Sequence, residues 1–366
     1  MKAPLVFIAT QADKTRENKS WMNAAEDLAI SLLIFSLDEL EFKITSEEMD
    51  LRFTNVSRDK ASTSFCSFFA IDRENRSLEL SAQSIQEANA IFIIRRLGRE
   101  ISIEDEMHLE HVKLQSKGES YHRNQLQFIQ RFLNRLDKIA MIESLGIRTL
   151  NSAKAIQTCM NKALTLSTVS DCTLNFLKTP QSYLISDVKS FLESTKKLEG
   201  PVVIKPIYGS KGKDMLLIGE DKISGKEQRQ ETLRKVQLLL KKSGSLLIQP
   251  FLAEMKGDMR FLVYKRRLIG MMDRIAAKED QWQFNIHKGS MCKEVAVSEA
   301  VEKKILQDSV RIAAHLETDL CGIDILHDES NYYFLEANSI PGLITIADYY
   351  IGTQKSIFHE ILSEFL

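Results

Sequence analysis

Short apolar runs recur along the first hundred residues, with helix-compatible segments between some of them. The runs are LVFIAT (5–10), SLLIFSL (31–37), SFFAID (67–72) and AIFIIRR (90–96), and WMNAAEDLAI (21–30) is helix-compatible. Short runs rich in β-branched and aromatic residues are typical of strands. Their alternation with helices predicts a small α/β domain with a mostly parallel sheet. No G-x-G-x-x-G follows a strand, so the dinucleotide-binding fingerprint is missing.

The second half of the chain has a different pattern, in which apolar strands are joined by short turns. GPVVIKPIYGSKGKDMLLIG (200–219) predicts a β-hairpin, and residues 245–277 predict a strand followed by a second hairpin with Arg260 and Arg274 at its opposite ends. GIRTLNSAKAIQTCMNK predicts a turn, a short strand and a helix that ends near Lys162. Residues 298–317 have the spacing of an amphipathic helix opened by a Ser298 cap.

Composition adds mainly exclusions. The chain has 366 residues, 44% hydrophobic and 27% charged, which is ordinary for a globular protein of two or three domains. Its net charge of -1 gives no reason to expect nucleic acid or an anionic membrane as a partner. Five widely spaced cysteines without a CxxC pair argue against a disulfide framework and a structural zinc. No apolar stretch approaches the roughly 20 residues of a membrane helix. We therefore expect a cytoplasmic protein.

Two acids lie within apolar segments near the end of the chain. CGIDIL carries Asp324, and YFLEANSIPG carries Glu336 and Asn338. A turn separates the two segments, so they should pair as antiparallel strands with all three side chains on one face. Carboxylates with an amide suit Mg²⁺. As metal ligands, Glu336 and Asp324 should be desolvated and repel each other. Alternatively, each acid could form an ion pair with Arg260 or Arg274. For either acid considered alone, the ion pair and the metal site fit the sequence about equally well.

The first hairpin carries a candidate phosphate loop. Lys205 ends its first strand and should be exposed in a cleft, and Gly209, Ser210 and Gly212 follow in the loop. Glycines let backbone N–H groups approach a phosphate closely. This is not a Walker A loop, because a strand follows it. Taken alone, a plain hairpin with a solvated lysine fits equally well. Downstream, the stretch from Gln249 to Leu252 ends a buried strand and could offer backbone groups to an adenine edge.

Together these segments resemble the ATP-grasp ligases, and within them the RimK-type glutamate ligase branch, over residues 145–350. The resemblance implies roles for particular residues. Lys162 and Lys205 match the two nucleotide lysines, and YGSKG, with Gly209, Ser210 and Gly212, resembles the loop that covers the phosphates. The remaining nucleotide-binding residues that the resemblance implies are Gln249, Phe251, Leu252, Asp258, Gln283 and Asn285. GIDIL and LEANSIPG match the family's metal pair, which implies Asp324, Glu336 and Asn338 as metal ligands.

The resemblance also implies a fold and an activity. The fold would be α/β (α+β), an ATP-grasp architecture with a Rossmann-like pre-ATP-grasp domain at residues 1–145, a central subdomain at 146–250 and a C-terminal subdomain at 251–366. The activity would be ATP-dependent ligation of a carboxylate to an amine through an acyl-phosphate, with Arg260 and Arg274 catalytic. ATP and one or two Mg²⁺ ions, with Mn²⁺ as an alternative, would be the cofactors. The amine would belong to an amino acid, a peptide or a protein tail, and homo-oligomer formation is left open.

Two other functions stay open, and Asp214, Gln283 and Lys288 depart from the family pattern. One alternative is a ligase that forms macrocycles within a peptide; the other is an ATP-binding regulatory protein without catalysis. Asp214 stands where the family commonly has glycine, so this part of the loop should be stiffer or repelled by phosphate. Gln283 stands where relatives often carry arginine.

Overall fold

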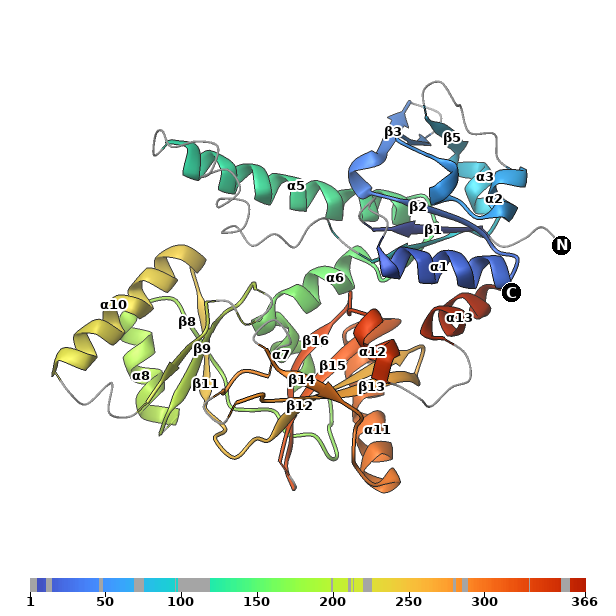
Figure 1. The fold of residues 1–366 in the computed structure, drawn as a ribbon. Coiled ribbons are helices and arrows are strands. Elements are labelled where there is room, and N and C mark those ends of the chain that lie inside the picture. The colour runs from blue at the N-terminus through green and yellow to red at the C-terminus, as the bar shows by residue number, and fades with distance from the viewer. Residues whose placement is uncertain are drawn as a thin grey trace. The chain divides into compact units, whose positions relative to one another are not determined.

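The computed structural model describes most of the chain as two compact units, one formed by Met1–Ala153 with Gln354–Leu366 and the other by Lys154–Thr353. The described residues are 5–10, 15–45, 49–68, 76–95, 97, 119–198, 200–209, 212, 214–219, 226–278, 281–284, 289–328, 330–349 and 356–366. Figure 1 labels their helices and strands. Each unit is described separately.

The first unit is built on a parallel sheet, as the alternating pattern predicts. Its strand order is β2-β1-β6-β7, and the three pairings along it are parallel. The strands are β1 (Leu5–Ala9), β2 (Ser31–Phe35), β6 (Ile91–Ile94) and β7 (Arg148–Leu150). The helices are α1 (Arg16–Asp27), α2 (Thr63–Phe68), α3 (Ala82–Glu87), α5 (Glu119–Ser144) and α13 (Ile357–Leu362). Every residue of β1 and β2 is buried, which explains why these strands are uninterrupted apolar runs.

A second sheet and a helix in this unit depart from the sequence prediction. β3 (Leu40–Ile44), β4 (Met49–Phe53) and β5 (Leu78–Ser81) form an antiparallel sheet that the pattern did not indicate. The strand predicted at 67–72 is wrong at its start, because residues up to Phe68 belong to α2. The Ser62 hydroxyl accepts the Phe65 N–H and so caps this helix. Residues 69–72 lie outside the described residues.

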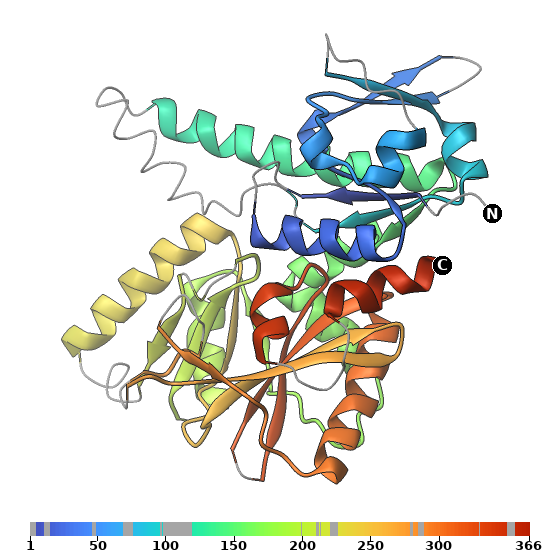
Figure 2. The ribbon, with the colours of Figure 1, turned by 45° about the vertical axis from the view of Figure 1, so that its right-hand side comes forward.

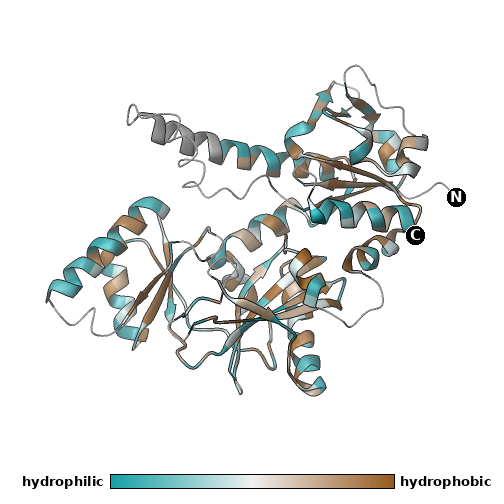
Figure 3. Cartoon of the chain, viewed as in Figure 1, coloured by the Kyte–Doolittle hydropathy of each residue, from teal (hydrophilic) through white to brown (hydrophobic). Residues whose placement is uncertain are grey.

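The second unit contains the predicted hairpin of the candidate phosphate loop. β9 (Val202–Pro206) and β10 (Leu216–Ile218) pair antiparallel, which confirms it. With β8 (Tyr183–Ile185) and β11 (Leu246–Pro250) they form a sheet in the order β10-β9-β11-β8. The helices α8 (Val188–Leu198) and α10 (Lys226–Ser243) pack against it through a shared apolar cluster. In Figure 3 the outer side of α10 is teal and the strands are largely brown, as expected for a one-sided apolar contact.

A five-stranded antiparallel sheet carries the two acidic segments. Its order is β14-β13-β12-β15-β16, and α11 (Glu299–His315) packs on one face (Figure 2). The strands are β12 (Gly257–Tyr264), β13 (Arg267–Ile275), β14 (Met291–Lys293), β15 (Leu320–His327) and β16 (Tyr332–Asn338). The Ser298 hydroxyl accepts the Val301 N–H, so the predicted helix cap is confirmed. Met259, Phe261 and Ile323 belong to the core on the α11 side. The alternate residues therefore face the other side, where the charged groups lie.

Two short helices precede these sheets, and their boundary corrects a prediction. α6 (Ala153–Met160) ends two residues before Lys162, and Lys162 begins α7 (Lys162–Ser170) instead of ending the first helix. The Asn161 side chain accepts the N–H groups of Ala163 and Leu164 and starts the new helix. α12 (Ile344–Tyr349) closes the unit.

The three domain ranges 1–145, 146–250 and 251–366 stay a proposal. The last residues of the chain belong to the first unit, whereas the ranges assign them to the C-terminal subdomain. Trp21 of α1 and Phe358 of α13 make an edge-to-face ring contact, which explains this grouping.

All five cysteines are free thiols. Within the described ranges, no helix is long and apolar enough to cross a membrane.

Candidate nucleotide and metal site

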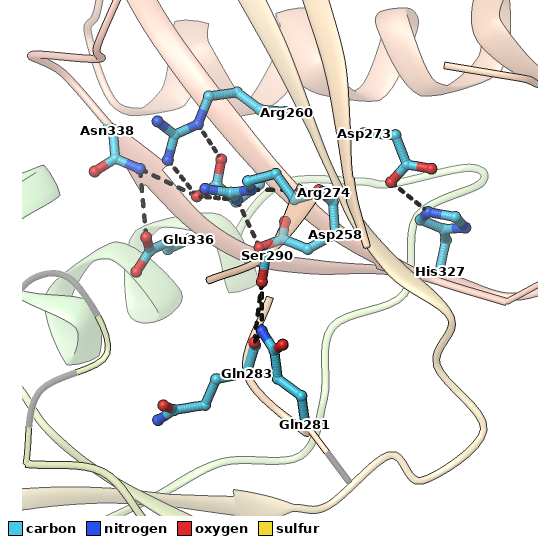
Figure 4. Close-up of polar contacts among 11 residues, drawn as sticks. Asp258, Arg260, Asp273, Arg274, Gln281, Gln283, Ser290, His327, Glu336 and Asn338 are labelled. Atoms are coloured by element: carbon cyan, nitrogen blue, oxygen red, sulfur yellow. Dashed lines mark hydrogen bonds and ion pairs between the residues drawn. The ribbon is translucent and has the colours of Figure 1, made fainter. Parts of the chain in front are cut away.

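One pocket of the second unit collects most of the residues expected to bind a nucleotide. Ten of the predicted site residues line it: Lys162, Lys205, Gly209, Gly212, Gln249, Phe251, Leu252, Asp258, Gln283 and Glu336. Four more, Arg260, Arg274, Asp324 and Asn338, form the polar cluster beside Asp258 and Glu336 (Figure 4). Ser210 and Asn285 lie outside the described residues. The structure therefore brings the described candidates together, and their roles remain a proposal.

Lys205 is buried, which corrects the expectation of an exposed lysine. It lies on β9 opposite Leu247 of β11, and only 7% of its surface is exposed. Burial, assisted by the nearby charge of Lys162, lowers its pKa to about 8, although Glu336 and Asp258 act in the opposite direction. A cation held in a desolvated wall of the pocket is ready to be neutralised by an anionic ligand.

Lys162 connects the start of α7 to the phosphate loop. Its backbone N–H donates to Ile207 O at 2.9 Å, and its ammonium donates to Gly209 O at 2.6 Å. The same ammonium lies 3.9 Å from Glu336 Oε2. Lys162 is thus placed where the loop, the helix start and the acid strand meet. The two lysines predicted from widely separated segments line the same pocket.

Asp324 is held by two arginines. Arg260 Nε donates to Asp324 Oδ1 and Arg260 Nη2 donates to Asp324 Oδ2, both at 2.6 Å. Arg274 Nη2 lies 3.0 Å from Asp324 Oδ2. Burial acts to raise the pKa of Asp324, but the two guanidiniums outweigh it and lower the pKa to about 2. The ion-pair alternative considered from the sequence is therefore realised for Asp324, and this acid is fully ionised at neutral pH.

The strand register explains why both arginines reach one acid. Asp258 pairs with Arg274, and Arg260 pairs with Met272 and with Asp324 across the other edge of β12. The two arginines consequently lie near the same end of the β12–β13 hairpin, and the prediction that they occupy opposite ends is wrong. The hairpin turn at residues 265–266 pairs Arg260 with Met272, and Arg274 lies two residues further along β13 on the same face.

Glu336 differs from Asp324 although the two residues are register partners. Its side chain is 31% exposed, so the expectation of a desolvated acid is wrong. The expected repulsion by Asp324 is also reduced, because the charge of Asp324 is compensated by the arginines. Asn338 Nδ2 lies 3.5 Å from both Asp324 Oδ2 and Glu336 Oε1, which places the amide and both acids on one face as predicted (Figure 4).

The donor set suits a hard cation such as Mg²⁺. Two carboxylates on neighbouring strands and one amide supply hard oxygen atoms, and Glu336 is accessible from the pocket. Across the described part of the chain, no group of three or more His, Cys, Asp and Glu side chains is arranged to hold a metal. Mg²⁺ commonly takes one or two protein carboxylates and completes its shell with phosphate and water. Asp324, Glu336 and Asn338 are therefore suited to hold it only together with a nucleotide.

Asp258 is a second buried acid on the pocket wall. Its Oδ2 lies 2.5 Å from Arg274 Nη2, and burial, which outweighs Arg274, raises its pKa to about 7. The other oxygen, Oδ1, is buried and has no hydrogen-bond partner within the described residues. An unpaired buried oxygen in a pocket wall indicates a position for a donor group of a ligand.

The hinge residues are partly engaged already. The backbone N–H of Phe251 donates to Pro201 O at 2.8 Å. This N–H group is therefore already used, contrary to the expectation that it could contact an adenine edge. Its side chain lines the pocket, and its ring meets that of Trp282 edge to face at 6.3 Å. The side chain of Gln249 donates to Ser182 Oγ at 2.7 Å. Backbone groups of Gln249 and Leu252 remain the candidates for recognising the base.

Sequence reasoning missed the apolar walls of the pocket. These residues are Pro180, Val203, Met215, Pro250, Met255, Trp282, Phe284, Leu326 and Leu335. The alternation on β15 could have indicated Leu326, which is two residues from Asp324 on the same strand. The segment QWQF places Trp282 beside the predicted Gln283. The combination of apolar walls with two lysines and two acids is suited to a base, a sugar and a phosphate chain.

Comparisons with known proteins agree with this geometry. A family model described as the RimK-like ATP-grasp domain matches residues 159–361. The chain is 25% identical over 199 residues to the probable alpha-L-glutamate ligase of Histophilus somni (strain 129Pt), covering 54% of this chain and 61% of the relative. It is 29% identical over 195 residues to the tetrahydromethanopterin:alpha-L-glutamate ligase of Methanosarcina acetivorans, covering 52% of this chain and 57% of the relative. The chain thus matches little more than half the length of these relatives.

Solved structures extend the likeness of fold to the whole chain. The ATP-grasp ligase PsnB complexed with minimal precursor has a TM-score of 0.62 and 13% identity, covering 100% of this chain and 99% of that one. The macrocyclase MdnC of Microcystis aeruginosa MRC, bound with precursor peptide MdnA, has a TM-score of 0.62 and 13% identity, with 99% of both chains covered. The predicted ATP-grasp fold is confirmed. The family model covers more than half of the 366 residues of the chain. The chain therefore belongs to the RimK-like ATP-grasp family.

Proposed function

We propose that the protein is an ATP- and Mg²⁺-dependent ligase that joins a carboxylate to an amine through an acyl-phosphate. The observation that carries the proposal is the gathering of Lys162, Lys205, Asp258 and Glu336 around one pocket with apolar walls. Membership of the RimK-like ATP-grasp family supports it. The relatives named as glutamate ligases favour an amino acid, glutamate first, as one of the two substrates.

Each charged group has a role that follows from its position. Lys162 and Lys205 would face the phosphate chain, because both are cations of the pocket wall and Lys162 also holds the phosphate loop. Asp258 Oδ1 would accept a ribose hydroxyl. Asp324, Glu336 and Asn338 would hold Mg²⁺, which when bound would neutralise charge on the β- and γ-phosphates. One ion or two, and Mn²⁺ in its place, are equally compatible with this donor set.

The arginines would act by exchanging partners. Arg260 and Arg274 both hold Asp324, so their charges are already directed at this acid. On binding of the nucleotide they would exchange oxygens of Asp324 for oxygens of the transferring phosphoryl group. Pre-positioned cations of this kind stabilise the charge that develops in phosphoryl transfer.

The reaction has two steps. A substrate carboxylate oxygen attacks the γ-phosphorus of ATP, the bond to ADP breaks, and an acyl-phosphate forms. The amine nitrogen then attacks the acyl carbon, loses a proton, and phosphate leaves with the carbon–oxygen bond electrons. The phosphate loop would exclude water while the acyl-phosphate exists, because hydrolysis would waste it.

A peptide substrate is the second candidate. The solved ligases PsnB and MdnC, whose fold extends over 99–100% of this chain, are bound to precursors, whereas the glutamate ligases match little more than half of it. The chemistry would be unchanged, with the carboxylate and the nucleophile both inside one peptide.

The test is a screen of amino acids, peptides and proteins with Mg·ATP, with products detected by mass spectrometry. A mass gain of one amino-acid residue supports the glutamate-ligase type, and loss of one water from a peptide supports the macrocyclising type. Binding of Mg·ATP without any product across the screen would favour the regulatory alternative. Absence of Mg·ATP binding would overturn the proposal.

A further inference from the structure

The candidate phosphate loop carries an acid where the nucleotide's charge would repel it. Asp214 lies between Gly212 and Met215, which both line the pocket, whereas Asp214 itself is not a lining residue. Gly212 and Asp214 have φ values of 65° and 56°, in the left-handed region. Aspartate is tolerated there better than most residues with a side chain. The turn explains how Asp214 fits, but it does not explain how its charge is accommodated.

A lysine of α10 compensates this charge. Lys242 Nζ lies 2.8 Å from Asp214 Oδ2, and the two side chains are 28% and 30% exposed. Lys242 is in the last turn of α10, where a cation is also favoured by the helix dipole. The ion pair directs the carboxylate toward α10 and joins the loop to that helix.

The loop is also held by two hydrogen bonds to its backbone carbonyls. Gln283 Nε2 donates to Gly212 O at 3.2 Å, and Lys162 Nζ donates to Gly209 O at 2.6 Å. Both contacts use backbone carbonyls of the loop as acceptors, so neither consumes a backbone N–H group. Among these contacts, the Lys242–Asp214 pair is distinct because it neutralises an acid.

We propose that Lys242 is a positioning residue for ATP, which neutralises Asp214 and keeps its carboxylate outside the pocket. Without Lys242, the carboxylate would face the triphosphate at short range, and the like charges would repel. This inference rests on the proposed function, because it requires ATP in this pocket. Asp214 and Lys242 would not contact ATP themselves, and their ion pair would affect ATP binding only through the position of the loop.

The test is a charge cycle at the two positions, measured as Mg·ATP affinity by calorimetry. Lys242→Met should weaken binding by about three- to tenfold, in line with one uncompensated charge in partly screened surroundings. Asp214→Asn should bind as tightly as the parent or more tightly, because the repelling charge is gone. The double variant should match Asp214→Asn. The matched control is Lys241→Met, which removes the same charge from the same turn of α10.

Two outcomes would overturn the inference. One is equal weakening by Lys242→Met and Lys241→Met, which would indicate a general loss of positive charge. The other is a double variant no tighter than Lys242→Met, which would mean that Asp214 is not the repelling group. Thermal melts of all variants confirm that each is folded.

A second measurement separates this inference from the proposed function. Hydrogen exchange of the peptide that spans 207–216 is followed without nucleotide. Exchange should be faster in Lys242→Met and in Asp214→Asn, which both lack the ion pair, and unchanged in Lys241→Met. If the parent does not bind Mg·ATP, the proposed function fails, and the exchange rates still test whether the ion pair holds the loop. Unchanged exchange in Lys242→Met would overturn that part.

Discussion

Arg260 and Asp324 face each other across β12 and β15, and two parallel hydrogen bonds of 2.6 Å join the guanidinium to the carboxylate. Arg274 adds a third contact to the same acid. Glu336, the register partner of Asp324 on β16, has Lys162 at 3.9 Å and a side chain that is 31% exposed. Two acids with one proposed role therefore differ in how they contribute to stability, and substitutions should separate them.

Glu336→Gln should leave the fold intact and remove turnover. A part-exposed pair with Lys162 contributes about 1 kcal/mol or less, so the free energy of unfolding should change little. Loss of one charge beside the transferring phosphoryl group should lower Mg·ATP-dependent turnover by at least about two orders of magnitude. Chemical unfolding and an ADP-release assay measure both. Glu294→Gln, at an exposed acid of the same unit, is the control, and turnover close to the parent's in Glu336→Gln would remove this acid from the site.

Asp324→Asn should destabilise the protein markedly. The substitution leaves the buried Arg274 and the mostly buried Arg260 with one fewer anionic partner, and breaking a buried ion pair in this way costs about 3–5 kcal/mol. Urea unfolding beside Glu336→Gln checks the contrast. Equal midpoints for the two variants would mean that the arginines do not depend on Asp324.

Lys205 should make both stability and ATP affinity depend on pH. Its pKa falls from 10.5 in the unfolded chain to about 8 in the folded protein. Between these values the unfolded chain holds the proton and the folded protein does not, so the free energy of unfolding should rise with pH, by about 3 kcal/mol across the window. ATP affinity should fall as pH rises through 8, because the cation is lost.

The matched variant is Lys205→Met, which keeps the length of the side chain. At pH 7 it should be as stable as the parent or more stable, and it should bind Mg·ATP more weakly by about 1.5–3 kcal/mol. Its stability should lack the parent's additional rise between pH 8 and 10.5. Parallel pH profiles for the two proteins would show that Lys205 does not titrate in this range.

Asp258 should determine whether the protein distinguishes ATP from its deoxy analogues. If Oδ1 accepts a ribose hydroxyl, the parent should bind ATP at least about tenfold more tightly than the 2′-deoxy or 3′-deoxy analogue at a pH above about 7, where Asp258 is ionised and the hydrogen bond is made to a charged group. Asp258→Asn should lose most of this preference. Calorimetry with the three nucleotides measures it, and a variant that keeps the full preference would place the sugar elsewhere.

The strands and the site were largely predictable, because their signals are local. The period of two places Asp324, Glu336 and Asn338 on one face, and the apolar runs of β1 and β2 indicate a buried parallel sheet. The hairpin around Lys205 was equally readable from its glycine-rich connection.

What the sequence could not provide depends on contacts between distant segments. The burial of Lys205 depends on neighbouring strands and pocket residues that come from other parts of the chain. The double pairing of Asp324 depends on strand register across three strands, which a one-residue difference would change. The strand predicted at 67–72 overlaps the end of the helix Thr63–Phe68, because a short apolar run fits both periods and the Ser62 cap was not recognised.

We expect an acyl-phosphate to form at the Glu336 end of the pocket, and hydroxylamine can trap it whichever amine is the natural acceptor. The protein is incubated with Mg·ATP, hydroxylamine and a panel of amino acids and peptides as carboxylates, and hydroxamate and nucleotide products are measured together. An acyl-phosphate at this site should give hydroxamate together with ADP and phosphate, and the products should depend on Mg²⁺ and be lost in Glu336→Gln. Release of AMP and pyrophosphate instead, or the same hydroxamate yield from Glu336→Gln, would contradict it.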